Sequence, residues 1–199
     1  MSNGVSGRIE NLETVADLIT YNQNINIGFS TPGEGLIQRS TGIITRWELP
    51  IPVFIDSSIG GSNVAEALAY WQSVTGLSFA NLGANAEPRI LIRAATAEEL
   101  NISIGLGLVY RTYPNNRALL GVVKIRTDFA DCSSQCSGLY RHELGHAIGI
   151  FGHIAGGALM ASPPVGTDAS RREINMLVQL YRLPHGASIE PDGTWRVVR

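Results

Sequence analysis

Three of the four histidines in this chain lie within twelve residues, and their spacing constrains the local fold more than any other feature of the sequence. The segment reads HELGHAIGIFGH from position 142 to position 153. His142 and His146 are four residues apart, so on a helix they lie on one face, about one turn from each other. Two imidazoles placed in this way can both reach one zinc ion at about 2.0–2.1 Å. Glu143 is offset by about 100° around the helix, so its carboxylate is expected beside the metal, in reach of a metal-bound water.

Gly149 and His153 extend the pattern beyond the helix. Glycine adopts positive φ at no steric cost, so Gly149 can end the helix and turn the chain back. The returning chain is expected to bring His153 to the metal. Three protein ligands leave a fourth position for water and substrate, which is typical of a catalytic zinc site. The sequence therefore predicts one zinc ion per chain, held by His142, His146 and His153, with Glu143 as the general base.

Composition and charge indicate one folded domain. A chain of 199 residues, 44% hydrophobic and 16% charged, can bury one substantial core. With a net charge of -2 and scattered arginines, it has no basic cluster that would attract nucleic acid. No stretch reaches the roughly 20 apolar residues that span a bilayer. We expect a monomer that neither binds nucleic acid nor spans a membrane.

The only two cysteines, Cys132 and Cys136, come just before the expected metal helix. They are too few for a structural zinc site, which normally takes four ligands. We expect a local disulfide, and hence an oxidising compartment; two free thiols in a loop are the alternative. Because Met1 leads into a polar stretch, either the protein is not exported or its signal peptide is absent from this sequence. Of the two, we expect a secreted or extracytoplasmic protein.

Hydrophobic period and turn residues predict an α/β fold with a mixed sheet. Two of the helices begin at capping boxes, Asn63 with Glu66 and Ser170 with Glu173. Besides the metal helix, helices are expected at residues 12–19, 63–76 and 170–184. Strands are expected at 45–56, 77–82 and 89–94, and a hairpin at 106–113 with 119–127. We expect residues 1–199 to form a single domain, with a lead-in at 1–42, a catalytic core at 43–185 and a tail at 186–199.

The histidine segment, together with GGALM at 156–160, resembles the zinc helix and Met-turn of the metzincin peptidases, and among them the matrixins. The likeness covers roughly residues 45 to 183 and is most specific in the histidine segment. It implies a zincin-type α+β fold: a mostly parallel twisted sheet with an antiparallel edge strand, an active-site helix, a Met-turn and a C-terminal helix. It also implies that Met160 forms an apolar floor beneath the metal.

The resemblance implies a zinc-dependent endopeptidase that hydrolyses peptide bonds in proteins through a zinc-bound water activated by Glu143. Its partners would then be protein or peptide substrates. An extended substrate is expected along the first strand of the hairpin, near residues 107–110. The specificity pocket would be walled by residues 162–168 and the zinc helix.

The sequence departs from the matrixin pattern at two places. Gly152 stands where the third histidine is usual, and His153 follows one residue later, while Met160 keeps its distance of eighteen residues from His142. We retain His153 as the third ligand, because a glycine-flanked loop absorbs an extra residue more easily than a helix does. The alternative is a carboxylate from elsewhere. Residues 95–111 contain neither Asp nor His, so we expect no second zinc and no calcium site.

Two other functions are compatible with the pattern. The first is a catalytically inactive zincin-fold binding or adhesion module, and the second is a metal hydrolase acting on a non-peptide amide. The intact Glu143 argues against the first, because loss of the general base is the simplest route to an inactive descendant. His185, near the carboxyl end, is expected at the surface rather than at the metal.

Overall fold

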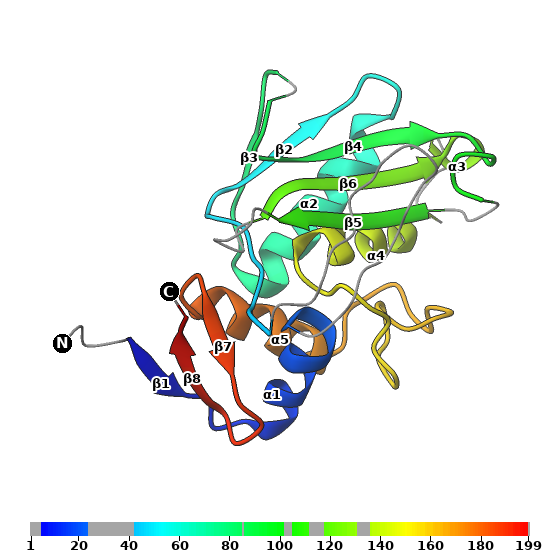
Figure 1. Ribbon diagram of the computed structural model, residues 1–199. Coiled ribbons are helices and arrows are strands. Elements are labelled where there is room, and N and C mark those ends of the chain that lie inside the picture. Colours follow the sequence, from blue (N-terminus) through cyan, green and yellow to red (C-terminus); the bar gives the residue numbers. More distant parts are fainter. Residues whose placement is uncertain are drawn as a thin grey trace.

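A five-stranded mixed sheet forms the upper part of the molecule in Figure 1. The computed structural model describes residues 5–23, 42–84, 86–101, 105–111, 118–130 and 136–198. In the order β3-β2-β4-β6-β5, every neighbouring pair is parallel except β5 with β6, which is antiparallel. The expected hairpin and the antiparallel edge strand are thereby confirmed. The strands are β2 (Ile51–Ile55), β3 (Phe79–Asn81), β4 (Arg89–Ala95), β5 (Gly105–Arg111) and β6 (Ala118–Arg126).

One face of this sheet is buried beneath helices. Alternate residues of neighbouring strands, such as Val53 of β2 and Ile90 of β4, are paired in register and are both buried. The helices α2 (Gly61–Thr75) and α4 (Ser137–Ile148) pack against each other, and α4 also packs on β5 and β6. A short helix, α3 (Thr127–Ala130), follows β6. The first part of the histidine segment, up to Ile148, is therefore helical, as predicted, and packs against the edge strand.

The start of α2 corrects one prediction. The helix begins at Gly61 with Gly60 as its N-cap, and no side chain caps it. Asn63 thus lies inside the helix, and the capping box predicted with Glu66 is wrong, because the chain enters the helix before it reaches Asn63. The helix ends as predicted at Gly76, which adopts φ 75°.

The two ends of the chain meet in a second, three-stranded antiparallel sheet in the lower part of Figure 1. Its order is β1-β8-β7, so a strand near the start lies beside one near the end. No strand was predicted in these segments, because strands of three or four residues are too short to show an alternating pattern. The strands are β1 (Ser6–Arg8), β7 (Ala187–Ile189) and β8 (Thr194–Val197).

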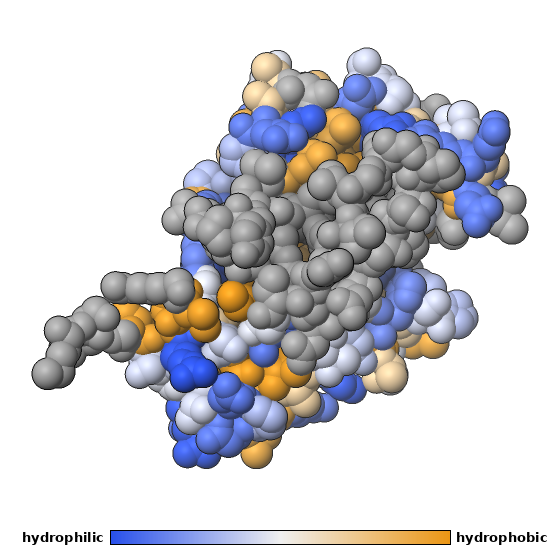
Figure 2. All heavy atoms as spheres, in the orientation of Figure 1, coloured by the Kyte–Doolittle hydropathy of each residue, from blue (hydrophilic) through white to orange (hydrophobic). Residues whose placement is uncertain are grey.

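Three helical segments connect this small sheet to the rest. The helix α1 (Leu12–Leu18) continues into a π-helical turn, η1 (Ile19–Gln23), and α5 (Arg171–Arg182) packs against α1. The predicted capping box of α5 is present, with Ser170 and Glu173 bonded in both directions. Apolar surface appears over the small sheet in Figure 2. Two large apolar residues at the ends of the described chain, Val5 and Val198, are exposed. Among the described residues, no helix has the length and apolarity needed to cross a lipid bilayer.

Candidate metal centre

The helix α4 carries three of the predicted site residues and ends where the sequence predicted. Its N-cap is Cys136, which is disulfide-bonded, whereas Cys132 lies outside the described residues. Gly149 follows the helix with φ 139°, and its N–H bonds to the carbonyls of Gly145 and His146. An L-residue with a side chain rarely adopts this backbone conformation, so glycine is required for the chain to turn back here.

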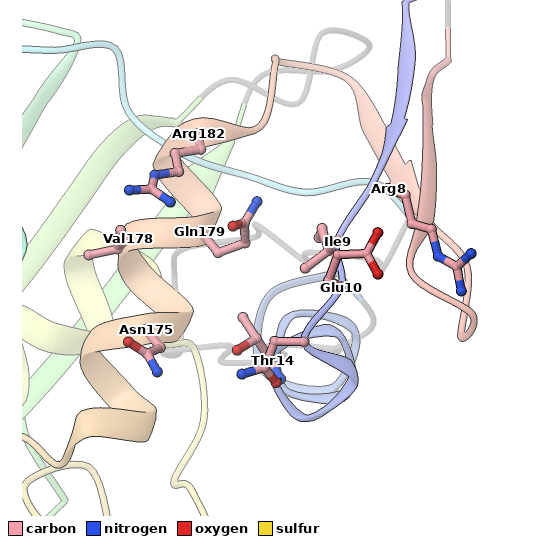
Figure 3. A pocket seen from close by; sticks show the side chains of 9 residues that line it. Arg8, Ile9, Glu10, Thr14, Asn175, Val178, Gln179 and Arg182 are labelled. Carbon is pink, nitrogen blue, oxygen red and sulfur yellow. The ribbon is translucent and has the colours of Figure 1, made fainter.

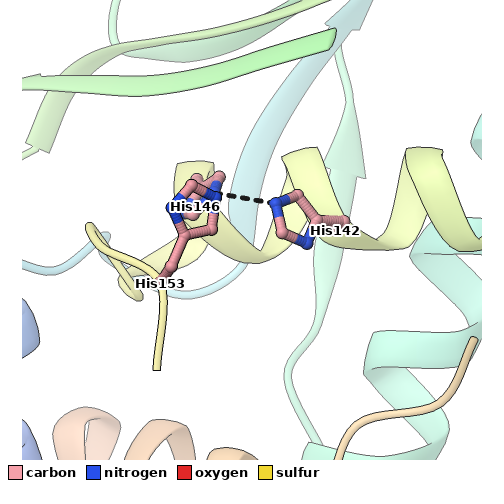
Figure 4. A group of neighbouring side chains, drawn as sticks. All are labelled: His142, His146 and His153. Atoms are coloured by element: carbon pink, nitrogen blue, oxygen red, sulfur yellow. Dashed lines mark hydrogen bonds between the residues drawn. The ribbon is translucent and has the colours of Figure 1, made fainter. Parts of the chain in front are cut away.

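The structure brings His142, His146 and His153 together (Figure 4). One ring nitrogen of each lies within 4.8 Å of those of the other two, and the ring centroids are 4.7 to 5.3 Å apart. His142 and His146 are buried, while His153 is exposed. Within the described part of the chain, this is the one group of three or more His, Cys, Asp or Glu side chains arranged to hold a metal ion.

Backbone carbonyls fix the tautomer of the two helical histidines. His142 Nδ1 lies 2.6 Å from the carbonyl oxygen of Leu159, and His146 Nδ1 lies 2.6 Å from that of Ile150. A carbonyl oxygen can only accept a hydrogen bond, so both Nδ1 atoms must carry the proton. In the neutral rings, both Nε2 atoms then present a lone pair. A carbonyl on Nδ1 is the usual orienting partner of a metal-binding histidine.

The distance between these two nitrogens fits a shared cation. His142 Nε2 and His146 Nε2 are 3.1 Å apart (Figure 4), although neither can donate to the other while both Nδ1 atoms hold the proton. Two nitrogens at 2.0–2.1 Å from one tetrahedral zinc would be about 3.3 Å apart. The donor set and its spacing therefore suit zinc, with His153 as the third nitrogen.

Burial keeps the helical histidines in the neutral form that binds metal. Desolvation, followed by the neighbouring His142, lowers the pKa of His146 to about 3. Desolvation also lowers the pKa of His142, although its hydrogen bond to Leu159 acts in the opposite direction. At neutral pH neither ring has to lose a proton before it can bind a cation.

The side chain of Glu143 lies beside the edge strand, in space that is open only because residue 105 is a glycine. Its side chain is buried with 7% of its surface exposed. A Cβ built on Gly105, the first residue of β5, would lie 2.6 Å from Glu143 Oε1 and 2.8 Å from its Cγ. Only glycine at position 105 leaves this carboxylate in place.

Met160 packs against the metal helix from the turn that follows it. A Cβ on Gly145 would lie 2.5 Å from Met160 Sδ, so the sulfur occupies the space left by that glycine. Glu173 Oε1 accepts hydrogen bonds from the backbone N–H groups of Ala158, at 2.9 Å, and Met160, at 2.8 Å. The carboxylate of Glu173 thus fixes the turn whose Leu159 carbonyl orients His142.

Sequence reasoning assigned Glu173 only to its helix cap and missed this second role. In a capping box only one carboxylate oxygen of the glutamate binds the N-cap. The other oxygen is left to accept further hydrogen bonds, and this was the one sign of a second role in the sequence. What it contacts could not be read from the local pattern, since the turn lies more than ten residues away.

His185 and a surface cavity lie apart from this centre. His185 Nε2 is 2.9 Å from Glu48 Oε1, and the side chain of His185 is only 15% exposed, so it is not the surface residue expected. A cavity of about 320 Å³ lies between the start of α1 and α5 (Figure 3). Its lining includes Arg8 and Arg182, which point away from each other, and none of the four histidines. Neither feature adds a group to the metal centre.

Comparisons with known proteins add little to this geometry. No protein-family model matches the sequence, and no curated protein matches it. Among solved structures, the chain is similar to high choriolytic enzyme 1, a hatching enzyme zinc-protease from the medaka fish Oryzias latipes. The TM-score is 0.34 at 19% identity, over 65% of this chain and 55% of that one. The chain thus spans about half the length of that enzyme, and at this TM-score the likeness supports neither fold nor function.

Proposed function

We propose that this protein is a zinc-dependent endopeptidase of the metzincin type, with His142, His146 and His153 as the metal ligands and Glu143 as the general base. One observation carries the proposal: carbonyls hold the protons of His142 and His146 on Nδ1, while their Nε2 atoms lie 3.1 Å apart beside His153. The disulfide-bonded Cys136 supports a secreted or extracytoplasmic location. We expect the protein to act as a monomer.

The chemistry is divided between the metal and Glu143. When bound, zinc supplies a Lewis acid that polarises a carbonyl and lowers the pKa of water toward neutrality. Glu143 follows His142 on α4, so its carboxylate can accept a proton from the attacking water and deliver it to the leaving amine. The buried position of Glu143 keeps competing water away from the carboxylate.

The edge strand offers a place for an extended substrate. β5 pairs with β6 on one side and, among the strands that the structure describes, is the last of the sheet, and α4 packs against it. A peptide added as a further strand beside β5 would use main-chain hydrogen bonds for affinity and would pass the histidines of α4. This placement favours an endopeptidase, because an added strand leaves both substrate ends free.

The experiment compares the wild type with Glu143→Gln on a broad peptide library read by mass spectrometry. The wild type should hold close to one zinc and cleave peptides, and chelation should abolish cleavage until zinc is returned. Glu143→Gln should keep its zinc and fold but lose at least about 100-fold in turnover, the lower end of what a general base contributes. Cleavage by the variant at the wild-type rate would reject Glu143 as the base. A zinc-loaded wild type that cuts no peptide would favour the inactive binding module instead.

A further inference from the structure

The turn that carries His153 is held by a segment far from it in the sequence. We define the His153 turn as residues 149–155. Asn22, in the π-helical turn η1, donates from Nδ2 to the carbonyl oxygens of Gly149, at 3.0 Å, and Thr45, at 2.8 Å. Its Oδ1 accepts from the N–H of Thr45 at 2.8 Å. Asn22 is only 1% exposed, so these bonds form away from competing water.

Tyr21 bonds to the His153 turn on both sides of the histidine. The N–H of Phe151 donates to the Tyr21 carbonyl at 2.8 Å, and the N–H of Ala155 donates to Tyr21 Oη at 3.2 Å. These two positions are two residues before and two residues after His153. Tyr21 therefore binds the backbone on both sides of His153, and this backbone determines the position of the imidazole.

Arg172 of α5 completes the attachment. Its Nη1 donates to the Ala155 carbonyl at 3.1 Å, while Nε and Nη2 donate to the two carboxylate oxygens of Asp17 at 2.8 and 2.6 Å. Asp17 lies on α1 and is only 2% exposed. The same ion pair thus joins α1, α5 and the end of the His153 turn.

We propose that Tyr21 and Asn22 are positioning residues for the third metal ligand, acting through the backbone of the His153 turn. This inference rests on the proposed zinc site. His153 is exposed and belongs to a turn rather than to a helix, so its own surroundings restrain it less than those of His142 and His146. Ordering a residue costs conformational entropy, and the bonds from η1 provide that order before metal arrives. They also hold in place a turn that is one residue longer than the matrixin pattern.

Asn22→Ala and Gln23→Ala form a matched pair that tests the proposal. Gln23 is the next residue of η1 and is similarly buried, but it bonds to Ile189 of β7 through its side-chain N–H, at 3.0 Å, and its Oε1, at 2.8 Å. Each variant removes buried side-chain to backbone bonds, but only Asn22→Ala removes one from the His153 turn. Zinc affinity of the folded protein, measured by competition with a chelator, should weaken about 10- to 100-fold for Asn22→Ala. It should stay within about twofold of wild type for Gln23→Ala.

Three further measurements extend the test, and the first keeps it valid even if Asn22→Ala folds poorly. Tyr21→Phe keeps the ring and removes only the acceptor for Ala155, and it should weaken zinc binding by about 2- to 10-fold. The rise in melting temperature on adding zinc should be smaller for Asn22→Ala than for Gln23→Ala, at equal zinc concentration. The visible spectrum of the cobalt-substituted protein should change in Asn22→Ala and stay unchanged in Gln23→Ala.

The outcomes separate this inference from the function on which it rests. If Asn22→Ala and Gln23→Ala weaken zinc binding equally, or Tyr21→Phe has no effect, the positioning role is rejected while the zinc site stands. If the wild type itself binds no zinc, the proposed function fails first.

Discussion

The two halves of the metal centre are built in different ways. The helical half consists of α4, where His142, Glu143 and His146 are buried and both histidines donate to backbone carbonyls. The turn half consists of residues 149–160, which carry the exposed His153 and the buried Met160. The first half obtains its geometry from one regular helix. The second obtains it from residues elsewhere in the chain.

This difference shows which part of such a site is robust. A helix fixes the separation of residues four apart by its own hydrogen bonds, so the first two nitrogens need little outside support. A turn has no such repeat, and here Tyr21, Asn22 and Glu173 supply its restraints. We therefore expect substitutions in the helical half to act directly on the chemistry, and those around the turn to act through position.

Removal of one ligand from each half should give the largest effect. Sharing the 10–16 kcal/mol of a four-ligand zinc site equally gives about 2.5–4 kcal/mol per ligand, or roughly 70- to 900-fold in affinity. We expect losses in this range for both His146→Ala and His153→Ala, and no change for His185→Ala, measured by chelator competition. Without metal the two should differ: the buried His146→Ala should destabilise the fold, while the exposed His153→Ala should stay within about 0.5 kcal/mol of wild type. Full zinc affinity without His153 would remove the turn half from the site.

Gly105→Ala tests the helical half without touching a ligand. The added Cβ would meet the Glu143 side chain at 2.6 Å and must displace it. A misplacement of about 1 Å can cost up to about 100-fold in rate, so we expect a loss of roughly 10- to 100-fold in turnover with zinc affinity unchanged. In a Glu143→Gln background the same substitution should cost little more, because the base is already gone. Equal losses in both backgrounds would show that Gly105 acts elsewhere.

Gly145→Ala tests the contact between the two halves. The new methyl would meet Met160 Sδ at 2.5 Å and Trp71 Cζ2 at 3.0 Å. Overpacking of this kind costs about 1–3 kcal/mol, and the gain in helix propensity offsets up to about 1 kcal/mol of it. We expect a net loss of about 1–2 kcal/mol in the free energy of unfolding by urea. The control is Gly138→Ala on the same helix, where the nearest atom is a Thr167 methyl at 3.2 Å, and a similar loss there would contradict the explanation.

The contrast between the halves also explains what the sequence could predict. The spacing of His142 and His146, the turn at Gly149 and the Ser170 cap all depend on residues within a few positions of each other. Each leaves a local pattern that can be recognised without a structure. That His153 would join the cluster was predicted from the returning chain, and the structure places it there.

The remainder could not be predicted because its contacts are distant in sequence. Asn22 and Gly149 are 127 positions apart, and Gln23 and Ile189 are 166 apart. A single buried side-chain amide leaves no repeating pattern in the sequence from which its hydrogen-bond partner could be predicted. The small sheet was missed for two reasons. Its strands are too short to show an alternating pattern, and β1 pairs with a strand at the far end of the chain.

The titration of the histidines in the metal-free protein tests whether burial distinguishes the two halves. Without metal, burial lowers the pKa of His146 to about 3, while an unfolded chain would titrate near 6.5. Between these values the unfolded state binds a proton that the folded state excludes, so stability is complete above pH 6.5 and falls as the pH drops toward 3. One such group changes the slope of the free energy of unfolding against pH by at most about 1.4 kcal/mol per pH unit.

Urea unfolding in the presence of a chelator, at pH 7 and at pH 5, should show this loss in the wild type. His146→Gln should reduce the loss clearly, because it removes the buried titrating ring. His153→Gln should reduce it less, because desolvation also lowers the pKa of His153 but the residue is more exposed. Equal reductions by the two variants would mean that the turn histidine is as desolvated as the helical one, and the distinction between the two halves would no longer hold.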